Sequence, residues 1–295
     1  MTRSERREMR AGIIFISPWL IGMGVFLAYP VLASVYYSFC EYSVLDKARP
    51  VGLANYTDLM GDRLFWKSLF NTVFFAALSI PLGLVLALGL AILLNTGVRG
   101  LTVYRTIFFL PALIPTVALG ILWLWIFNGE NGILNMFLTS IGIGAPGWLT
   151  DPVWSKPALI LLSMWGIGHA MVIFLAGLQD VPVHLYEAAD LDGANWWHKV
   201  RHITVPMVSP VILFNLIMGI IGALQYFTLP YIMTPNGQPA HSAYFYAMYL
   251  YDNAFLYLRM GYASAMAWIL FVLILALTLL SLRLAARHVH YEAAP

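Results

Sequence analysis

Long apolar stretches that lack Asp, Glu, Lys and Arg alternate with short polar segments along this chain of 295 residues. About 20 helical residues cross a hydrocarbon core roughly 30 Å thick, so each stretch of that length predicts a transmembrane helix. We expect spans near 13–38, 69–94, 106–128, 157–179, 208–230 and 264–282. No Gly/Ser linker separates them. The predicted fold is therefore all-α: a polytopic membrane protein with six transmembrane helices, forming a single domain over residues 1–295.

Prolines inside the predicted spans are expected to bend them. Pro81 lies in the second span, Pro111 and Pro115 lie in the third, and Pro210 lies near the start of the fifth. Proline removes a backbone donor, and lipid tolerates this only where neighbouring helices or cavity water satisfy the freed carbonyls. Bent helices suit the lining of a transport pathway, but they are also common in other polytopic proteins. Both interpretations stay open.

The composition agrees with a membrane protein. Apolar residues make up 61% of the chain, charged residues 10%, and the mean hydropathy is +0.78. A soluble domain would carry roughly 25% charged residues. The single cysteine, Cys40, excludes an intramolecular disulfide and a multi-cysteine metal site. The net charge of +2 is small, and its surplus at span ends calls for no nucleic-acid partner.

Positive charges predict the orientation in the membrane. The first apolar run is far longer than the roughly 7–15 residues of a signal peptide, so we expect an uncleaved span. With both termini cytoplasmic, segments 95–105 and 180–207 are cytoplasmic too. The predicted inner set then holds ten cations: Arg3, Arg6, Arg7, Arg10, Arg99, Arg105, Lys199, Arg201, Arg283 and Arg287. The outer set holds six: Lys47, Arg49, Arg63, Lys67, Lys156 and Arg259. The excess favours this orientation.

The cytoplasmic loop 180–207 is a polar island with the pattern of two short helices. Pro182 can start the first helix, and Glu187 lies within its first turns, where the helix dipole favours a carboxylate. Gly193 can adopt a left-handed conformation and end that helix. A second helix through Trp196, Trp197 and Val200 would lead to the next span. Periodicity alone also fits an ordinary amphipathic loop helix.

The residues of this loop resemble a known signature. Glu187-Ala188-Ala189, Gly193 six residues after the Glu, and Val205-Pro206 are similar to the signature loop of binding-protein-dependent ABC importer permeases. In that family the loop is a coupling helix that docks in a cleft of the cytoplasmic ATPase. The resemblance implies this coupling role for Glu187, Ala188, Ala189, Asp190, Gly193, Ala194 and Pro206.

Further segments are similar to carbohydrate-uptake permeases of this family, such as those for maltose, glycerol phosphate and multiple sugars. They are Ser17-Pro18, Tyr29-Pro30, Ser38-Phe39, residues 52–56, 65–72, 104–111 and 148–152. Where those relatives often have Thr-x-Gly-Gly-Pro after the fifth span, this chain has residues 234–239, Thr-Pro-Asn-Gly-Gln-Pro. This departure weakens inferences about the neighbouring loop.

The resemblance implies a set of partners. These are a second permease subunit, which we expect to be a related but different chain, two ATPase subunits, an extracytoplasmic solute-binding protein and membrane lipid. The chain contains no G-x-x-x-x-G-K-[ST] phosphate loop, so ATP and Mg²⁺ are expected on the partner ATPase and no cofactor on this chain. The expected location is the prokaryotic plasma (inner) membrane.

Five residues are candidates for contact with the solute. His169, Gln225 and Tyr226 are polar residues in the fourth and fifth spans, and their spacing from the signature loop resembles that of solute-contacting positions in sugar permeases. Gly166 and Gly219 could open room beside them. A hydroxyl-rich solute needs hydrogen-bond partners and aromatic faces. Hydrogen bonding between helices is the alternative role of these polar side chains.

Two other classes of function are alternatives to an importer subunit. An ion-coupled secondary transporter usually has ionisable residues inside its spans, and the six windows contain no Asp, Glu, Lys or Arg. Sodium sites built from backbone carbonyls would escape this test. An intramembrane enzyme is the second alternative. Asp190-Leu191-Asp192-Gly193 could be mistaken for a phosphorylation or metal motif, but the preceding Glu187-Ala188-Ala189 indicates a helix, and no metal site is expected.

The loop near 231–263 is rich in aromatic residues, including Tyr244, Phe245, Tyr246, Tyr249, Tyr251, Phe255 and Tyr257. An interfacial helix, a docking surface for an outer partner and an aromatic belt at the lipid headgroups all fit this pattern. The tail pair His288 and His290 is expected to be solvated.

Overall fold

The computed structural model describes residues 3–96 and 100–285. Arg99, Arg287, His288 and His290, named above, lie outside the described residues. The chain divides into two compact units, one formed by residues 1–62 and 250–271 and the other by residues 63–249 and 272–295. Each unit is described by itself below, and the single-domain organisation stays a prediction.

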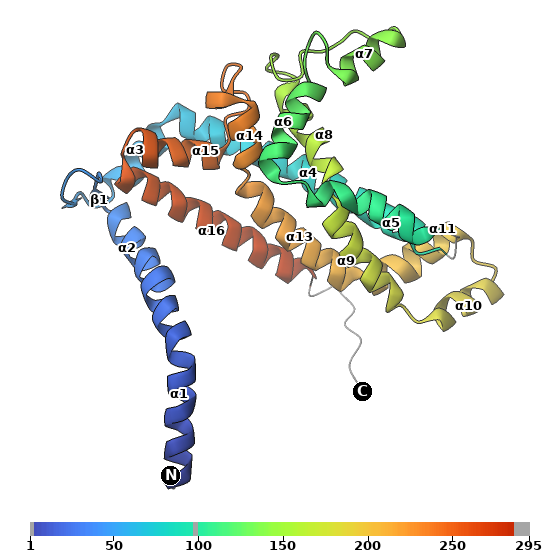
Figure 1. Ribbon diagram of the computed structural model, residues 1–295, viewed down its shortest axis with the longest axis horizontal. Coiled ribbons are helices and arrows are strands. Elements are labelled where there is room, and N and C mark those ends of the chain that lie inside the picture. The colour runs from blue at the N-terminus through green and yellow to red at the C-terminus, as the bar shows by residue number, and fades with distance from the viewer. Residues whose placement is uncertain (1–2, 97–99, 286–295) are drawn as a thin grey trace. The chain divides into compact units, whose positions relative to one another are not determined.

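The first unit contains the long helical stretch at the start of the chain, a short hairpin and the beginning of the last helix (Figure 1). Its elements are α1 (Arg3–Met23), a π-helical turn (Gly24–Ala28), α2 (Tyr29–Ser38), β1 (Cys40–Glu41), β2 (Arg49–Pro50), α3 (Ala54–Gly61), a second π-helical turn (Asp252–Leu256) and the first part of α16 (Met260–Ala285).

Two close contacts hold the hairpin region of the first unit. The Asn55 side-chain amide donates to the carbonyls of Ser38 and Cys40, both at 2.9 Å. A Cβ at Gly261 would stand 2.0 Å from the Cys40 carbonyl oxygen, so only glycine allows this approach. The start of α16 is therefore packed directly on the end of β1.

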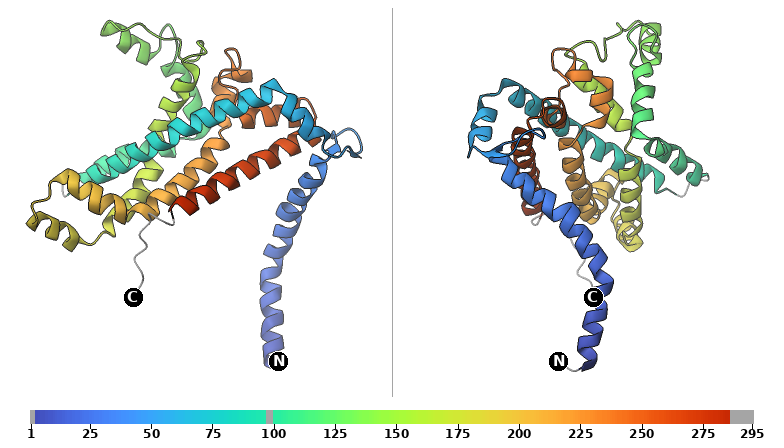
Figure 2. Two further views of the ribbon diagram at one scale, coloured as in Figure 1. Left: turned by 180° about the vertical axis from the view of Figure 1, so that it is seen from behind. Right: turned by 60° about the vertical axis from the view of Figure 1, so that its left-hand side comes forward.

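The second unit is a helical assembly around α4 (Figure 2, the long cyan helix). Its elements are α4 (Arg63–Leu94), α5 (Leu101–Phe109), a 3₁₀ turn (Leu110–Leu113), α6 (Thr116–Ile126), α7 (Ile133–Ser140), α8 (Ser155–Trp165), α9 (Gly168–Gln179), α10 (Val183–Leu191), α11 (Trp196–Lys199), a π-helical turn (Val200–Thr204), α12 (Val205–Met207), α13 (Ser209–Leu224), α14 (Thr228–Met233), a 3₁₀ turn (Pro235–Gly237) and α15 (Tyr246–Tyr251).

Helix α4 packs along its length against α8, α9 and α13. At one end of this packing, Ala87 and Ala91 of α4 are fully buried against Met171 and Phe174 of α9. Small side chains let two helices approach closely, and helix association in lipid depends on such close packing. The three partners of α4 are therefore fixed against one central helix.

The chain is an all-α membrane protein, and its spans follow the predicted windows with two bends. Four stretches are long and apolar enough to cross a membrane: Arg7–Ser38, Arg63–Leu94, Ser209–Met233 and Met260–Ala285. Two helix pairs, Leu101–Leu113 with Thr116–Ile126 and Ser155–Trp165 with Gly168–Gln179, are long and apolar enough only when taken together, and they are bent by 97° and 45°. The number of spans among the described residues is therefore four, or six if each bent pair crosses once.

The prolines act differently from one another. Pro111 and Pro115 lie at the 97° bend, as predicted. Helix α4 continues through Pro81, where a bend was expected to interrupt the span. Pro210 lies in the first turn of α13, where the missing N–H would have no helical partner anyway. The 45° bend contains no proline and falls at Gly166 and Ile167.

Four aromatic residues of the 231–263 segment form a packed core. Tyr244, Phe245, Tyr246 and Tyr249 are all buried within the protein. An aromatic belt would expose these rings to the headgroup layer, so the belt interpretation is wrong for these four.

Candidate functional site

Helix α10 of the loop 180–207 has the start and end that the sequence predicts. Pro182 precedes its first residue, and Gly193 has a φ of 74°. The Gly193 N–H donates to the Asp190 carbonyl at 3.1 Å, and the Ala194 N–H donates to the Ala189 carbonyl at 2.9 Å. These two bonds form a complete Schellman motif. The conformation predicted for Gly193 is confirmed.

Glu187 lies beyond the first turn of α10, which is the part of the helix where the dipole favours a carboxylate. The first turn contains no acidic residue. Because the dipole effect falls off within that turn, it gives Glu187 little stabilisation, contrary to our expectation. The Glu187 side chain is exposed, as is Ala188, whereas Ala189 and Ala194 are partly covered. The triplet therefore places the Glu187 carboxylate beside the small side chains of two alanines.

A second helix follows, and side chains tie it back to α10. Asn195 caps α11 by accepting a hydrogen bond from the His198 N–H at 2.9 Å. Lys199 pairs with Asp190 at 2.6 Å, and the Tyr186 hydroxyl lies 3.0 Å from the Thr204 hydroxyl. Asp190 therefore closes the turn between the helices. Pro206, partly covered, lies in the short helix α12 that leads to α13.

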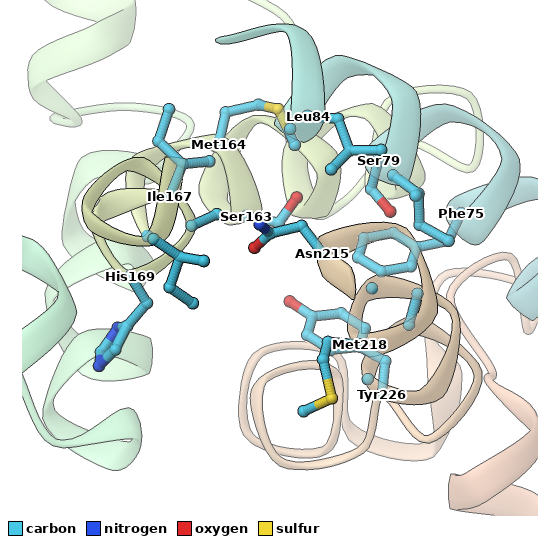
Figure 3. Close-up of a pocket in the computed structure, with 18 of the residues that line it drawn as sticks. Phe75, Ser79, Leu84, Ser163, Met164, Ile167, His169, Asn215, Met218 and Tyr226 are labelled. Atoms are coloured by element: carbon cyan, nitrogen blue, oxygen red, sulfur yellow. The ribbon is translucent and has the colours of Figure 1, made fainter. Parts of the chain in front are cut away.

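A cavity of about 620 Å³ lies between α4, the α8–α9 pair and α13 (Figure 3). Four of the five predicted solute residues line it: Gly166, His169, Gly219 and Tyr226. Gln225 is exposed and does not line the cavity. In Figure 3 the imidazole of His169 points away from the space that Asn215 and Tyr226 face. Tyr226 is thus the predicted polar residue best placed to contact a ligand.

The Tyr226 hydroxyl is buried and has no hydrogen-bond partner within the described part of the chain. Its ring stacks on Phe75 with centroids 4.4 Å apart and planes 5° apart. An unpaired buried hydroxyl costs free energy, roughly 1–3 kcal/mol in protein mutational data. A ligand hydroxyl in the cavity would recover that cost.

Sequence reasoning missed three polar residues of the cavity, Ser79, Ser163 and Asn215. Helical spacing could have found them. Phe75, Ser79 and Gly83 recur every four residues on α4, and Asn215 and Gly219, also four residues apart, share a face of α13. Among the described residues, the cavity lining contains no Asp, Glu, Lys or Arg. The site therefore combines an uncharged wall, four hydroxyl or amide groups and one aromatic pair.

Comparisons with known proteins connect both regions to transport. A family model described as "Binding-protein-dependent transport system inner membrane component" matches residues 79–290, which include the loop and, except for Phe75, the residues that line the cavity. The chain is 40% identical over 296 residues to the probable ABC transporter permease protein YesP of Bacillus subtilis, covering 99% of this chain and 96% of that protein. It is 36% identical over 276 residues to the lactose transport system permease protein LacF of Rhizobium radiobacter, covering 91% and 92%.

The fold is also similar to a solved structure. A chain of a bacterial ABC transporter involved in the import of the acidic polysaccharide alginate matches with a TM-score of 0.84, covering 97% of this chain and 99% of that chain at 23% identity.

Proposed function

We propose that this chain, which belongs to the family of binding-protein-dependent transport system inner membrane components, forms half of the pathway of an ABC importer for a sugar or sugar-like solute. Energy comes from ATP hydrolysis on partner subunits. Family membership favours this function over an ion-coupled secondary transporter.

One observation carries the proposal: the two ends of the loop 180–207 join helices that line the cavity. At one end, α10 follows α9, which contributes His169 and Ile173 to the lining. At the other end, α12 leads into α13, which contributes Asn215. The joints themselves are buried, because Val181 and Val208 belong to one hydrophobic cluster with α4 and α9. A displacement of the loop therefore moves cavity walls.

The sugar class is supported by the cavity chemistry. A sugar presents several hydroxyls and an apolar ring face, and it is usually uncharged. Ser79, Ser163, Asn215 and Tyr226 offer hydrogen bonds, and Phe75 with Tyr226 offers an aromatic surface. The relationship to a lactose permease points the same way.

The complex we propose contains a second, related permease chain that completes the cavity. Two ATPase subunits bearing ATP and Mg²⁺ hold the coupling loops, which in this chain comprise Glu187, Ala188, Ala189, Asp190, Gly193, Ala194 and Pro206. ATP binding draws the loops together and turns the cavity outward, where a docked solute-binding protein releases the sugar. Hydrolysis restores the inward-facing state. Both termini of this chain lie in the cytoplasm of a prokaryotic cell.

A mild-detergent pull-down of this chain from its native membrane tests the assembly. Mass identification should recover a P-loop ATPase and a second polytopic chain. Recovery of this chain alone, still active in vesicles without ATP, would refute the importer.

The contact with the ATPase is tested by reversing one charge. Glu187→Lys should abolish ATP hydrolysis stimulated by solute and binding protein, while membrane insertion is unchanged. Asp192→Lys is the matched control, because Asp192 is an exposed carboxylate at the end of the same helix. Normal uptake by Glu187→Lys, or equal loss in both variants, contradicts the role of Glu187.

A further inference from the structure

Side chains of α4 and α8 hold the loop between α14 and α15. The Asn71 amide donates to the carbonyls of His241 and Tyr244, both at 3.0 Å. Lys156 donates to the Ser242 carbonyl at 3.1 Å. Lys67 donates to the Ala240 carbonyl at 2.6 Å. Four carbonyls of this loop thus accept hydrogen bonds from side chains of α4 and α8.

Further bonds join the two helices through the same loop. Lys156 also donates to the Asn71 side-chain oxygen at 3.3 Å, and the Ser155 and Ser242 hydroxyls are 2.7 Å apart. Thr72 accepts the Tyr246 N–H at 2.8 Å. We call Asn71, Thr72, Ser155 and Lys156 the loop clamp. Asn71, Thr72 and Ser155 are buried, so water does not readily replace these bonds.

The loop needs the clamp because its backbone is strained. Ala240 and His241 have φ values of 50° and 55°. A left-handed conformation costs a non-glycine residue roughly 1–2 kcal/mol. Two adjacent residues keep this left-handed conformation only when surrounding contacts hold them in it.

The buried ring of Phe245 connects the loop clamp to the cavity. Phe245 is fully buried and meets Phe75 and Tyr226 edge-on, with centroids 5.5 and 5.6 Å away. Phe75 and Tyr226 are the stacked pair of the cavity wall. Phe245 follows directly on Tyr244, whose carbonyl Asn71 holds.

We propose that Asn71 and Lys156 are positioning residues for the cavity: they fix the loop that seats Phe245 behind the Phe75–Tyr226 pair. Neither residue lines the cavity, so the effect on the solute is exerted through the aromatic pair. The link to transport rests on the proposed function, whereas the link from clamp to cavity does not.

The chain provides a matched control for a bond of this kind. Asn135 also donates its amide to two carbonyls, those of Gly129 and Pro146, at 3.0 and 3.1 Å. It is as buried as Asn71, at 2% exposure each, but the hydrogen-bond partners of its side chain are Gly129, Pro146 and Trp148, none of which belongs to the loop between α14 and α15. Asn135→Ala should therefore cost comparable stability without disturbing the cavity wall.

The first measurement is independent of any solute. Ser79 lines the cavity one turn beyond Phe75 and is buried. In the assembled complex with Cys40→Ser, Ser79→Cys should react slowly with a maleimide. Adding Asn71→Ala or Lys156→Met should raise the labelling rate at least tenfold, and Lys156→Arg should restore a slow rate. Thr72→Val, a milder change, should give an intermediate rate. Asn135→Ala should leave labelling unchanged despite a similar drop in melting temperature.

A measurement of solute uptake then distinguishes the positioning role of the loop clamp from the proposed transport function. With tritiated lactose and maltose as probes, Asn71→Ala should lower uptake at least fivefold while ATPase assembly persists. Unchanged labelling in the clamp variants, or equal acceleration by Asn135→Ala, overturns the positioning role. Faster labelling with normal uptake keeps the positioning role and refutes the cavity as the solute site.

Discussion

Replacing Gly193 by alanine tests whether the end of α10 has to keep its shape for the ATPase to bind. A Cβ at Gly193 meets no atom within 4 Å, so the only cost is the φ of 74°. That cost is roughly 1–2 kcal/mol. The contacts that hold the turn are of similar size. The exposed Asp190–Lys199 pair contributes less than about 1 kcal/mol, and the Tyr186–Thr204 hydrogen bond about 1 kcal/mol.

The population of molecules in which the end of α10 keeps the docking geometry should therefore fall about 5- to 30-fold. In nanodiscs titrated with the ATPase subunit, we expect the apparent affinity to fall by that factor and the maximal hydrolysis rate to recover at saturation. Gly142→Ala is the control. Gly142 has a φ of 79°, open space around its Cβ position and the same pair of Schellman bonds at the end of α7. An affinity within twofold of wild type for Gly193→Ala, or an equal fall for Gly142→Ala, would refute the reasoning.

Two further substitutions test the cavity and the packing around it. Tyr226→Phe removes a hydroxyl that has no partner among the described residues, so the melting temperature should stay the same or rise. Loss of one hydrogen bond should weaken binding of the transported solute to the nanodisc complex about 2- to 12-fold, measured by equilibrium dialysis, and unchanged binding would contradict the role of Tyr226. A Cβ at Gly177 would lie 2.6 Å from a Val211 methyl, so Gly177→Ala should destabilise the α9–α13 contact by about 1–3 kcal/mol. Adding Val211→Ala should restore most of the lost melting temperature, and a failure to do so would place the strain elsewhere.

Rules that depend on neighbouring residues predicted the structure of the loop 180–207 more completely than they predicted the bends of the spans. A left-handed glycine after a short helix is set by residues within one turn, so Gly193 could be read directly from the sequence. The rule cannot tell Gly193 from Gly142, which ends α7 in the same way. Only the resemblance to a coupling loop assigned a function to the first of them.

The bends could be predicted only in part, because they depend on packing as well as on proline. Pro111 and Pro115 lie four residues apart and lead to a 97° break, whereas α4 absorbs Pro81 within a continuous helix. The bend at Gly166 has no proline, and Gly168 lies close to the Phe108 carbonyl, 2.9 Å from its Cβ position. Close approach of a second helix is not visible in a hydropathy window.

The candidate solute residues were predicted from their polarity, which does not distinguish two adjacent polar residues. Gln225 and Tyr226 are neighbours, but only Tyr226 lines the space. Helix α13 ends at Leu224, so residues beyond it no longer follow the helical period. Ser79 and Asn215 were missed because a single hydroxyl or amide in an apolar span usually satisfies itself on the preceding turn, as Asn215 does with Val211 at 3.0 Å.

Helix α4 gives the molecule a mechanical property that no single contact has. Its 32 residues extend about 48 Å, with Asn71 of the loop clamp near one end, Ser79 of the cavity in the middle and the buried Ala91 near the other end. Pivoting such a rod by about 5° at one end carries the other end roughly 4 Å. A rotation too small to break the packing around its pivot would thus displace the far end by more than the length of a hydrogen bond.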